Sequence, residues 1–257
     1  MIDKAFDDRS PAMISPRDAI SQEALILAAQ FRISTFIVTF SCNLIKSLYE
    51  KGTIEILHDV LQVGSAAGKN PIYRIRNTDI GVILCGIGAP AATAILEEIR
   101  TLFNCRNFIV FGSCGSLVDL PAGRVIIPDE AYRDEGTSYH YAPASDFITV
   151  KNADKLAEMM EQLEVGYVKG KTWTTDALYR ETVNNRNTRV EQGCICVEME
   201  CSRLQAMCDF RGIELYQFVY AADSLDSSWS RRILGNLEMD SRLKYFYLAW
   251  EIAKRID

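Results

Sequence analysis

The chain has 257 residues, of which 48% are hydrophobic, and a formal net charge of -6 at pH 7. The acidic balance argues against nucleic acid or an anionic membrane as a partner, because both require clustered Lys and Arg. No apolar run reaches about eighteen residues and residues 1–13 hold no apolar signal core, so we expect a soluble cytoplasmic protein. The length suits a single α/β domain, residues 1–257, around one large core.

In the first half of the chain, runs rich in β-branched residues predict strands and helically spaced apolar residues predict helices. Residues 1–30 are polar, contain prolines and end in a helix at Ser21–Phe31, so we treat them as an N-terminal extension of unknown role. A loop is predicted at Gly64–Gly68. The predicted strands are Ile33–Phe40, Glu55–Val63, Ile72–Ile75, Ile80–Cys85 and Asn107–Phe111, and the predicted helices are Asn43–Lys51 and Ala91–Phe103.

The second half of the chain repeats this alternation of strands and helices. A long polar and aromatic loop is predicted at Ala131–Pro143. The predicted strands are Arg124–Pro128, Val165–Trp173, Cys194–Val197 and Ile213–Ala221, and the predicted helices are Asn152–Leu163, Met199–Met207 and Met239–Ile256. Alternation of this kind predicts an α/β fold with helices packed on a largely parallel sheet.

Eight cysteines and two histidines restrict the metal chemistry of the chain. Most cysteines, such as Cys85 and Cys105, lie in apolar runs, which is typical of buried, reduced thiols. The densest group is Cys194, Cys196, Cys201 and Cys208. Its C-x-C spacing is not that of a zinc site, so we predict no metal and no cofactor.

Two carboxylates, Glu198 and Glu200, follow the strand Cys194–Val197 directly. Ligands of α/β proteins bind at the edge where strands end. A carboxylate at that edge can accept two hydrogen bonds from a vicinal diol, such as the 2′ and 3′ hydroxyls of a ribose. The alternative is structural, because both carboxylates could instead complement the positive end of the following helix.

A glycine-rich segment, Gly112-Ser-Cys-Gly-Ser116, follows the strand Asn107–Phe111 and is predicted to be a loop. Its glycines allow the backbone to approach a ligand closely and leave the Ser113 hydroxyl directed at it. An ordinary tight turn is an equal alternative. Small or acidic residues also follow other strands, at Asp176 and Asp223, which favours a polar, neutral ligand with hydroxyl groups.

Several ordered motifs resemble the purine nucleoside phosphorylase and uridine phosphorylase family, which also contains the methylthioadenosine/S-adenosylhomocysteine nucleosidases. The motifs are Val82–Ala92, Ile109–Leu117, Gly170–Tyr179, Cys196–Leu204 and Ala221–Ser224. The resemblance covers Ile33–Asp257. It implies a three-layer α/β/α fold around a distorted mixed sheet, assembled as homodimers or trimers of dimers.

The resemblance also implies how a nucleoside would be bound. Glu200 would bind the ribose diol, with Glu198 beside it, and Met199 would pack on the sugar. Trp173 would lie against the base. The Gln-x-Arg pair with which uridine phosphorylases bind uracil is replaced by Thr182-Val-Asn184, which favours a purine.

For catalysis, the resemblance implies that Asp223 protonates or hydrogen-bonds N7 of the purine leaving group. An Asp with an ordinary pKa near 3.9 is ionised at neutral pH, so burial or a neighbouring carboxylate must raise the pKa of this one. Arg231, or its neighbour Arg232, would orient the aspartate. Ser113 and Gly112 would form the pocket of the nucleophile.

The chain departs from the family where phosphorylases hold phosphate. Their Gly-Asp-Pro-x-Arg loop after the first strand reads Phe40-Ser-Cys-Asn-Leu44, and the arginine before the serine is Val110. A third arginine has no counterpart in 58–64. Each charged hydrogen bond contributes about 1.5–3 kcal/mol, so losing three costs about 5–9 kcal/mol of phosphate binding.

Three functions follow. The favoured one is a nucleoside phosphorylase of purine salvage, with phosphate as co-substrate and a rebuilt site that uses Arg74, Arg76 or Arg133. The second is a nucleosidase that uses water, which explains the missing arginines, although its water-activating glutamate is not evident. The third is a non-catalytic nucleoside-binding or storage protein, for which an acid at the leaving group has no purpose.

Overall fold

The computed structural model describes residues 2–64 and 70–256, so the predicted loop Gly64–Gly68 lies, beyond Gly64, outside the described residues. The main sheet consists of β1 (Thr35–Thr39), β2 (Ile54–Ile56), β5 (Tyr73–Ile75), β6 (Ile80–Leu84), β7 (Asn107–Ser116), β8 (Val125–Asp134), β9 (Phe147–Thr149), β10 (Tyr167–Thr175), β11 (Cys194–Glu198) and β12 (Glu214–Ser224). A separate pair consists of β3 (Gln62–Val63) and β4 (Asn70–Pro71).

The main sheet is mixed and follows the order β11-β10-β8-β12-β7-β1-β6-β5-β2. Parallel pairs join β6 to β1, β1 to β7 and β7 to β12, and a second parallel group joins β8, β10 and β11. β11 then returns to pair antiparallel with β7, with Cys196 opposite Ser116. This second pairing of β11 brings its carboxyl-terminal residues next to those of β7.

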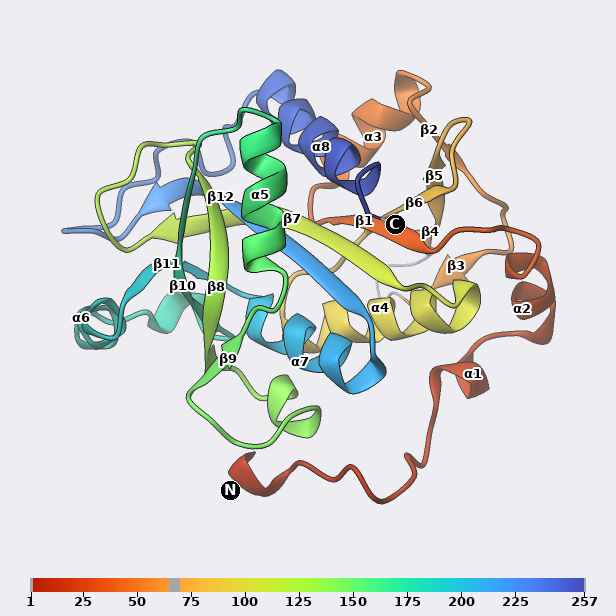
Figure 1. Ribbon diagram of the computed structural model, residues 1–257, viewed down its shortest axis with the longest axis horizontal. Helices are drawn as coiled ribbons and strands as arrows, with labels where there is room; N and C mark the ends of the chain where they lie inside the picture. Colours follow the sequence, from red (N-terminus) through yellow and green to blue (C-terminus); the bar gives the residue numbers. More distant parts are fainter. Residues whose placement is uncertain (1, 65–69, 257) are drawn as a thin grey trace.

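Helices lie on both faces of the sheet (Figure 1). One face carries α3 (Cys42–Glu50), α5 (Ala153–Gln162) and α8 (Met239–Ala253), and the other carries α4 (Ala89–Phe103) and α7 (Cys201–Arg211). On β1, Ile37 packs with the first group, whereas Phe36 and Val38 pack with the second. Neighbouring strand residues point to opposite faces, so wholly apolar strands are buried on both sides.

Each of the remaining helices has nine residues or fewer and buries at most two side chains. They are η1 (Ile2–Lys4), α1 (Pro16–Ala19), α2 (Gln22–Ala28), η2 (Thr137–His140), η3 (Leu178–Arg180) and α6 (Val183–Glu191). The sequence analysis did not anticipate α6, because this helix buries no side chain and therefore has no apolar face to detect.

Three predicted elements differ from the structure. The strand predicted at Glu55–Val63 is two short strands, β2 and β3, with a turn between them. The loop predicted at Gly112–Ser116 is the second half of β7, because it pairs with β12 as far as Ser224 and with β11. The loop predicted at Ala131–Pro143 begins as the end of β8, which pairs with β10 up to Asp134.

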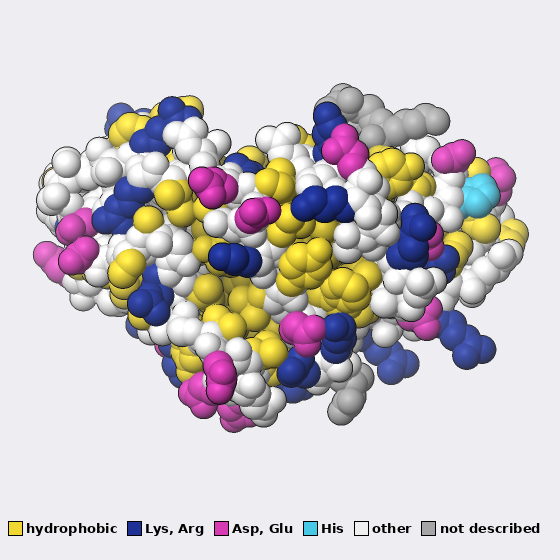
Figure 2. Space-filling model, turned by 90° about the horizontal axis from the view of Figure 1, so that it is seen from above, with side chains coloured by type: hydrophobic (Ala, Val, Ile, Leu, Met, Phe, Trp, Pro, Cys, Tyr) yellow, Lys and Arg dark blue, Asp and Glu magenta, His cyan; other side chains and the backbone are white. Residues whose placement is uncertain are grey.

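The molecular surface carries mixed charge. On the face shown in Figure 2, Lys and Arg side chains alternate with Asp and Glu side chains around a central hydrophobic area. Among the described residues, no helix is long and apolar enough to cross a membrane.

Candidate active site

A cavity of about 220 Å³ opens where β7 and β11 meet. Ser113 reaches it from β7, and Asp223 reaches it from the end of β12. Glu198, Met199 and Glu200 reach it from the junction of β11 and α7. The structure therefore brings together five residues that the sequence analysis proposed from separate motifs.

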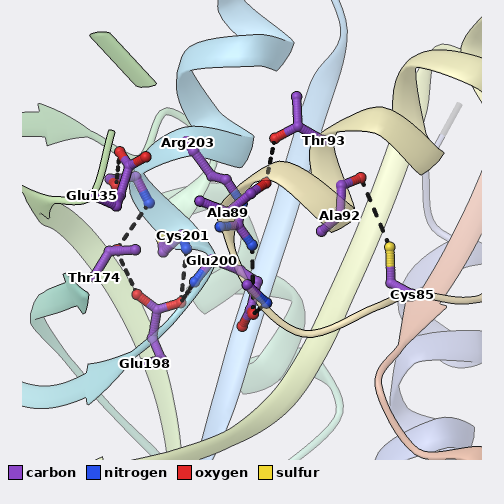
Figure 3. A network of polar contacts seen from close by, with 12 residues as sticks. Cys85, Ala89, Ala92, Thr93, Glu135, Thr174, Glu198, Glu200, Cys201 and Arg203 are labelled. Atoms are coloured by element: carbon purple, nitrogen blue, oxygen red, sulfur yellow. Dashed lines mark hydrogen bonds and ion pairs between the residues drawn. The ribbon is translucent and has the colours of Figure 1, made fainter. Parts of the chain in front are cut away.

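Glu200 is held by groups from two elements. Its Oε1 accepts a hydrogen bond from the Gly88 N–H at 2.8 Å and lies 3.5 Å from Nη2 of Arg203 (Figure 3). Gly88 starts α4 with φ 97°, a conformation that favours glycine. Burial raises the pKa of the Glu200 carboxyl, and the Arg203 charge opposes this effect. With Oε1 engaged, Oε2 is the oxygen left for a ligand.

Glu198 is engaged on both oxygens (Figure 3). Its Oε2 accepts the N–H groups of Glu200 and Cys201, both at 2.7 Å, and its Oε1 accepts the Thr174 hydroxyl at 2.6 Å. Burial, followed by the Glu200 charge, raises its pKa to about 7. Glu198 thus accepts hydrogen bonds from the first N–H groups of α7, which is the structural alternative given in the sequence analysis. These bonds also fix the backbone of Glu200.

Asp223 is buried and has one side-chain partner. Its Oδ2 accepts a hydrogen bond from Trp229 Nε1 at 3.0 Å. Burial raises the pKa of Asp223, while the Trp229 hydrogen bond and the Arg232 charge oppose the rise. The elevated pKa is in the direction that an acid catalyst requires.

The cavity also contains Glu181, which the sequence analysis passed over. Burial, and then the charge of Asp223, raises the pKa of Glu181 to about 7. The Glu181 carboxyl beside Asp223 can therefore hold a proton near neutral pH. Its position in the sequence could have identified it as a site residue, because Glu181 directly precedes Thr182-Val-Asn184, the segment compared with the uracil-binding pair of uridine phosphorylases.

Arg232, and not Arg231, lies near the aspartate. Arg231 is exposed, and its Nε donates to the Leu234 carbonyl at 3.1 Å. Arg232 Nη1 lies 3.4 Å from Ser116 Oγ, and that hydroxyl donates to the Asp223 carbonyl at 3.0 Å. Of the two arginines considered for orienting Asp223, the structure therefore favours Arg232.

Trp173 does not line this cavity among the described residues. It is 1% exposed, packs with Leu117 and Val197, and donates from Nε1 to Asp134 Oδ2 at 2.9 Å. The reason is side-chain packing on one face of β10, where Leu117, Cys194 and Val197 surround the Trp173 ring. The apolar walls of the cavity include Leu178, Leu225 and Met199 instead.

Gly112 lines a smaller cavity of about 140 Å³ beside the first one, together with Ser113, Ser41 and Arg242. None of the arginines proposed for a rebuilt phosphate site lines either of these cavities among the described residues.

Those three arginines have other partners. Arg74 and Arg76 pair with Glu55, at 2.6 and 3.6 Å. Arg133 is buried, and it donates to Ser138 Oγ at 2.9 Å and to the Pro143 carbonyl at 2.6 Å. A phosphate role for these three arginines therefore stays a prediction, and the structure places none of them at the two cavities.

The cysteines add no metal centre to the site. All eight are free, and seven of them are buried. In residues 2–64 and 70–256, no group of three or more His, Cys, Asp and Glu side chains could hold a metal ion.

Comparison with known proteins gives one family match and several distant relatives. The model of the family described as "Phosphorylase superfamily" matches residues 57–236. A DeoD-type purine nucleoside phosphorylase from Shewanella oneidensis is 28% identical over 158 residues, which cover 60% of this chain and 66% of that enzyme. A guanosine phosphorylase from Halorubrum lacusprofundi is 25% identical over 177 residues, covering 64% of this chain and 71% of that enzyme.

Two solved structures share the fold. An AMP nucleosidase from Bacteroides thetaiotaomicron superposes with a TM-score of 0.67 at 15% identity, covering 90% of this chain and 98% of its own. A purine nucleoside phosphorylase from Toxoplasma gondii in complex with immucillin-H gives 0.66 at 18% identity, covering 88% and 94%. These matches confirm the predicted mixed α/β fold with a central sheet.

Proposed function

The chain belongs to the phosphorylase superfamily, and we propose that it cleaves the N-glycosidic bond of a purine nucleoside with phosphate as the acceptor. The observation that carries the proposal is the joint presence of Glu200 and Asp223 in one cavity of about 220 Å³. The Glu200 carboxylate suits the hydroxyls of the sugar, and the Asp223 carboxyl suits the leaving base. A protein that only binds nucleosides has no need of a buried acid at the leaving group.

Glu200 is the proposed ribose ligand. Gly88 and Arg203 hold its Oε1, so its Oε2 can accept hydrogen bonds from the 2′ and 3′ hydroxyls. Met199 packs on the sugar in this proposal, and Glu198 keeps the backbone of Glu200 in place. In this proposal Glu200 binds the sugar and Glu198 positions Glu200.

Asp223 is the proposed acid. The C1′–N bond breaks, its electron pair moves into the base, and the carboxyl proton moves to N7 of the purine. An oxygen of phosphate forms the new bond to C1′, which gives free purine and a sugar 1-phosphate, and the proton of phosphate restores the carboxyl group. A well-placed acid accelerates such a step by about 10²–10⁴-fold.

Hydrolysis is the second candidate, because the three expected arginines are absent from Phe40–Leu44, Val110 and 58–64. Water would then supply the oxygen, giving free sugar and base. The fold likeness to an AMP nucleosidase is compatible with this alternative. The predicted homodimer or trimer of dimers, the cytoplasmic location and the role in purine salvage remain predictions.

The test is release of base from inosine, adenosine, guanosine, uridine and methylthioadenosine, each with and without phosphate. Release that requires phosphate, with formation of sugar 1-phosphate, supports phosphorolysis. Release at the same rate without phosphate supports the nucleosidase. Binding without release from any of these substrates contradicts both enzymatic proposals.

A further inference from the structure

The smaller cavity lies at the carboxyl end of β1, where Thr39 is opposite Phe111 in the middle of the parallel strand β7. It shares Phe40, Ile87 and Ser113 with the proposed nucleoside cavity, so the two spaces adjoin. Its polar side chains include the hydroxyls of Ser41 and Ser113. Ser113 is exposed to this space, although the strand that carries it is otherwise largely buried.

Arg242 brings a positive charge to this cavity from α8, near the other end of the chain. Its Nη1 donates to Ser41 Oγ at 2.9 Å, across 201 residues of sequence, and its Nε donates to the Leu237 carbonyl at 3.0 Å. In the part of the chain that the structure describes, Arg242 forms no ion pair with a carboxylate. A half-buried guanidinium without a counter-charge suits an anionic ligand.

Ser41 connects this arginine to the start of α3. Its hydroxyl accepts the Leu44 N–H at 3.3 Å as the cap of a nine-residue helix. The positive end of that helix therefore adjoins the same cavity and adds to the attraction for an anion. Arg242, Ser41 and Ser113 come from three separate elements and line one small space.

We propose that this cavity binds a phosphoryl dianion, with Arg242 as its cationic ligand and Ser41 and Ser113 as hydroxyl donors. The inference rests on the proposed function, because it places the anion next to the proposed sugar site. Arg242 supplies from α8 the charge that the family supplies from positions occupied here by Phe40–Leu44 and Val110. The phosphoryl group is either free phosphate, acting as the acceptor, or the 5′-phosphate of a nucleotide substrate.

The test compares Arg242→Gln with wild type and with Arg255→Gln. Arg255 lies just beyond the end of α8, pairs with Glu251 at 2.9 Å and lines neither cavity, so it matches the loss of charge. The first readout is the rise in Tm produced by phosphate or by a purine nucleoside 5′-monophosphate, which a ligand of the folded state causes without turnover. Wild type and Arg255→Gln should respond to at least one of these ligands, and Arg242→Gln should lose that response.

Kinetics then identify the source of the phosphoryl group. If free phosphate binds, Arg242→Gln should raise its KM by about 10- to 100-fold, the effect of one charged hydrogen bond, with the nucleoside KM nearly unchanged. If a 5′-phosphate binds, the same rise should affect the nucleotide and spare the nucleoside. Arg242→Lys, which keeps the charge, should recover part of either loss.

Failure of this inference is distinguishable from failure of the proposed function. Base release without any effect of Arg242→Gln on phosphate or nucleotide parameters overturns the anion site and leaves glycosidic cleavage standing. Protection by phosphate that depends on Arg242, without base release, supports the site and contradicts the enzyme. Absence of protection of wild type by either ligand overturns the site directly. Ser113→Ala gives a second test that does not disturb Arg242, and this variant should bind the same ligand more weakly than wild type.

Discussion

Oε1 of Glu200 lies 3.5 Å from Nη2 of Arg203, a side chain with no exposed surface (Figure 3). Its Nε, Nη1 and Nη2 have no hydrogen-bond partner among the described residues, so the guanidinium acts chiefly as a charge. A buried arginine in this state is costly to the fold. Its evident effect is to oppose the rise that burial causes in the pKa of Glu200.

Replacing Arg203 by Met should therefore weaken nucleoside binding, and most strongly at pH values between the pKa of Glu200 in the wild type and its higher pKa in the variant. Without the arginine, the pKa of Glu200 rises further, and a protonated carboxyl is a poorer acceptor for a ribose diol. We expect the nucleoside KM to rise about 10-fold near neutral pH, with the acidic limb of the KM profile moved to higher pH.

The control for this variant is Arg211→Met on the same helix. Arg211 pairs with the buried Glu97 at 2.8 Å but lies away from the cavity. It should lose stability without changing the pH profile of KM. Identical profiles for wild type and Arg203→Met would remove Arg203 from the control of Glu200.

Asp223→Asn should abolish most turnover while preserving binding. An amide cannot donate the proton that the purine needs at N7, so kcat should fall by about 10²–10⁴-fold with a similar nucleoside KM. A riboside with a nitrophenolate leaving group needs no protonation, and its cleavage by the variant should remain close to that of wild type. Equal losses on both substrates would indicate damage to the cavity and not loss of an acid.

Glu181 should make the stability of the protein depend on pH. Its pKa is about 7 in the folded protein against an ordinary 4.5, because burial and the Asp223 charge disfavour ionisation. The stabilisation from the protonated group is complete below about pH 4.5 and is lost as pH rises through about 7. Denaturant unfolding should show that this decline is smaller in Glu181→Gln. The exposed Glu191→Gln serves as the control, and parallel curves for wild type and Glu181→Gln would refute the assignment.

Gly115→Ala should displace the side chains that pack against Gly115 in the candidate site. A Cβ at this position would lie 2.5 Å from Leu225 Cδ1, 3.1 Å from Val197 Cγ1 and 3.4 Å from Asp223 Oδ1. Overpacking of this kind costs about 1–3 kcal/mol of unfolding free energy and should also reduce kcat by displacing Asp223. Gly136→Ala is the matched control, because its Cβ would meet nothing within 4 Å. Equal Tm and kcat for the two variants would show that the contact with Leu225 is not restrictive.

Sequence reasoning found Glu200 and Asp223 because both stand at the end of an apolar strand, a position visible from local pattern alone. The family resemblance placed Trp173 against the base, but its ring is buried among Leu117, Cys194 and Val197, contacts that the local sequence does not reveal. Gly112–Ser116 was predicted as a loop because glycine usually interrupts strands. Its pairing with β11 and β12 could not be derived from local composition.

Arg242 was beyond reach of the sequence for a different reason. It contacts Ser41 across 201 residues, and no motif connects the two positions. The sequence could show that the usual arginines were missing near Phe40 and Val110, but only the packing of α8 reveals which cation lies beside them. Contacts between distant segments carry information that local patterns lack.

Release of free purine from inosine, adenosine and guanosine is the most direct test of the account, measured for wild type and for a Glu200→Gln, Asp223→Asn double variant purified in parallel. The parallel variant controls for any contaminating enzyme. We predict that wild type releases purine from at least one nucleoside in the presence of phosphate, and that the double variant is at least about 100-fold slower. Equal release by both proteins, or no release by wild type while a nucleoside still binds, would contradict the proposal.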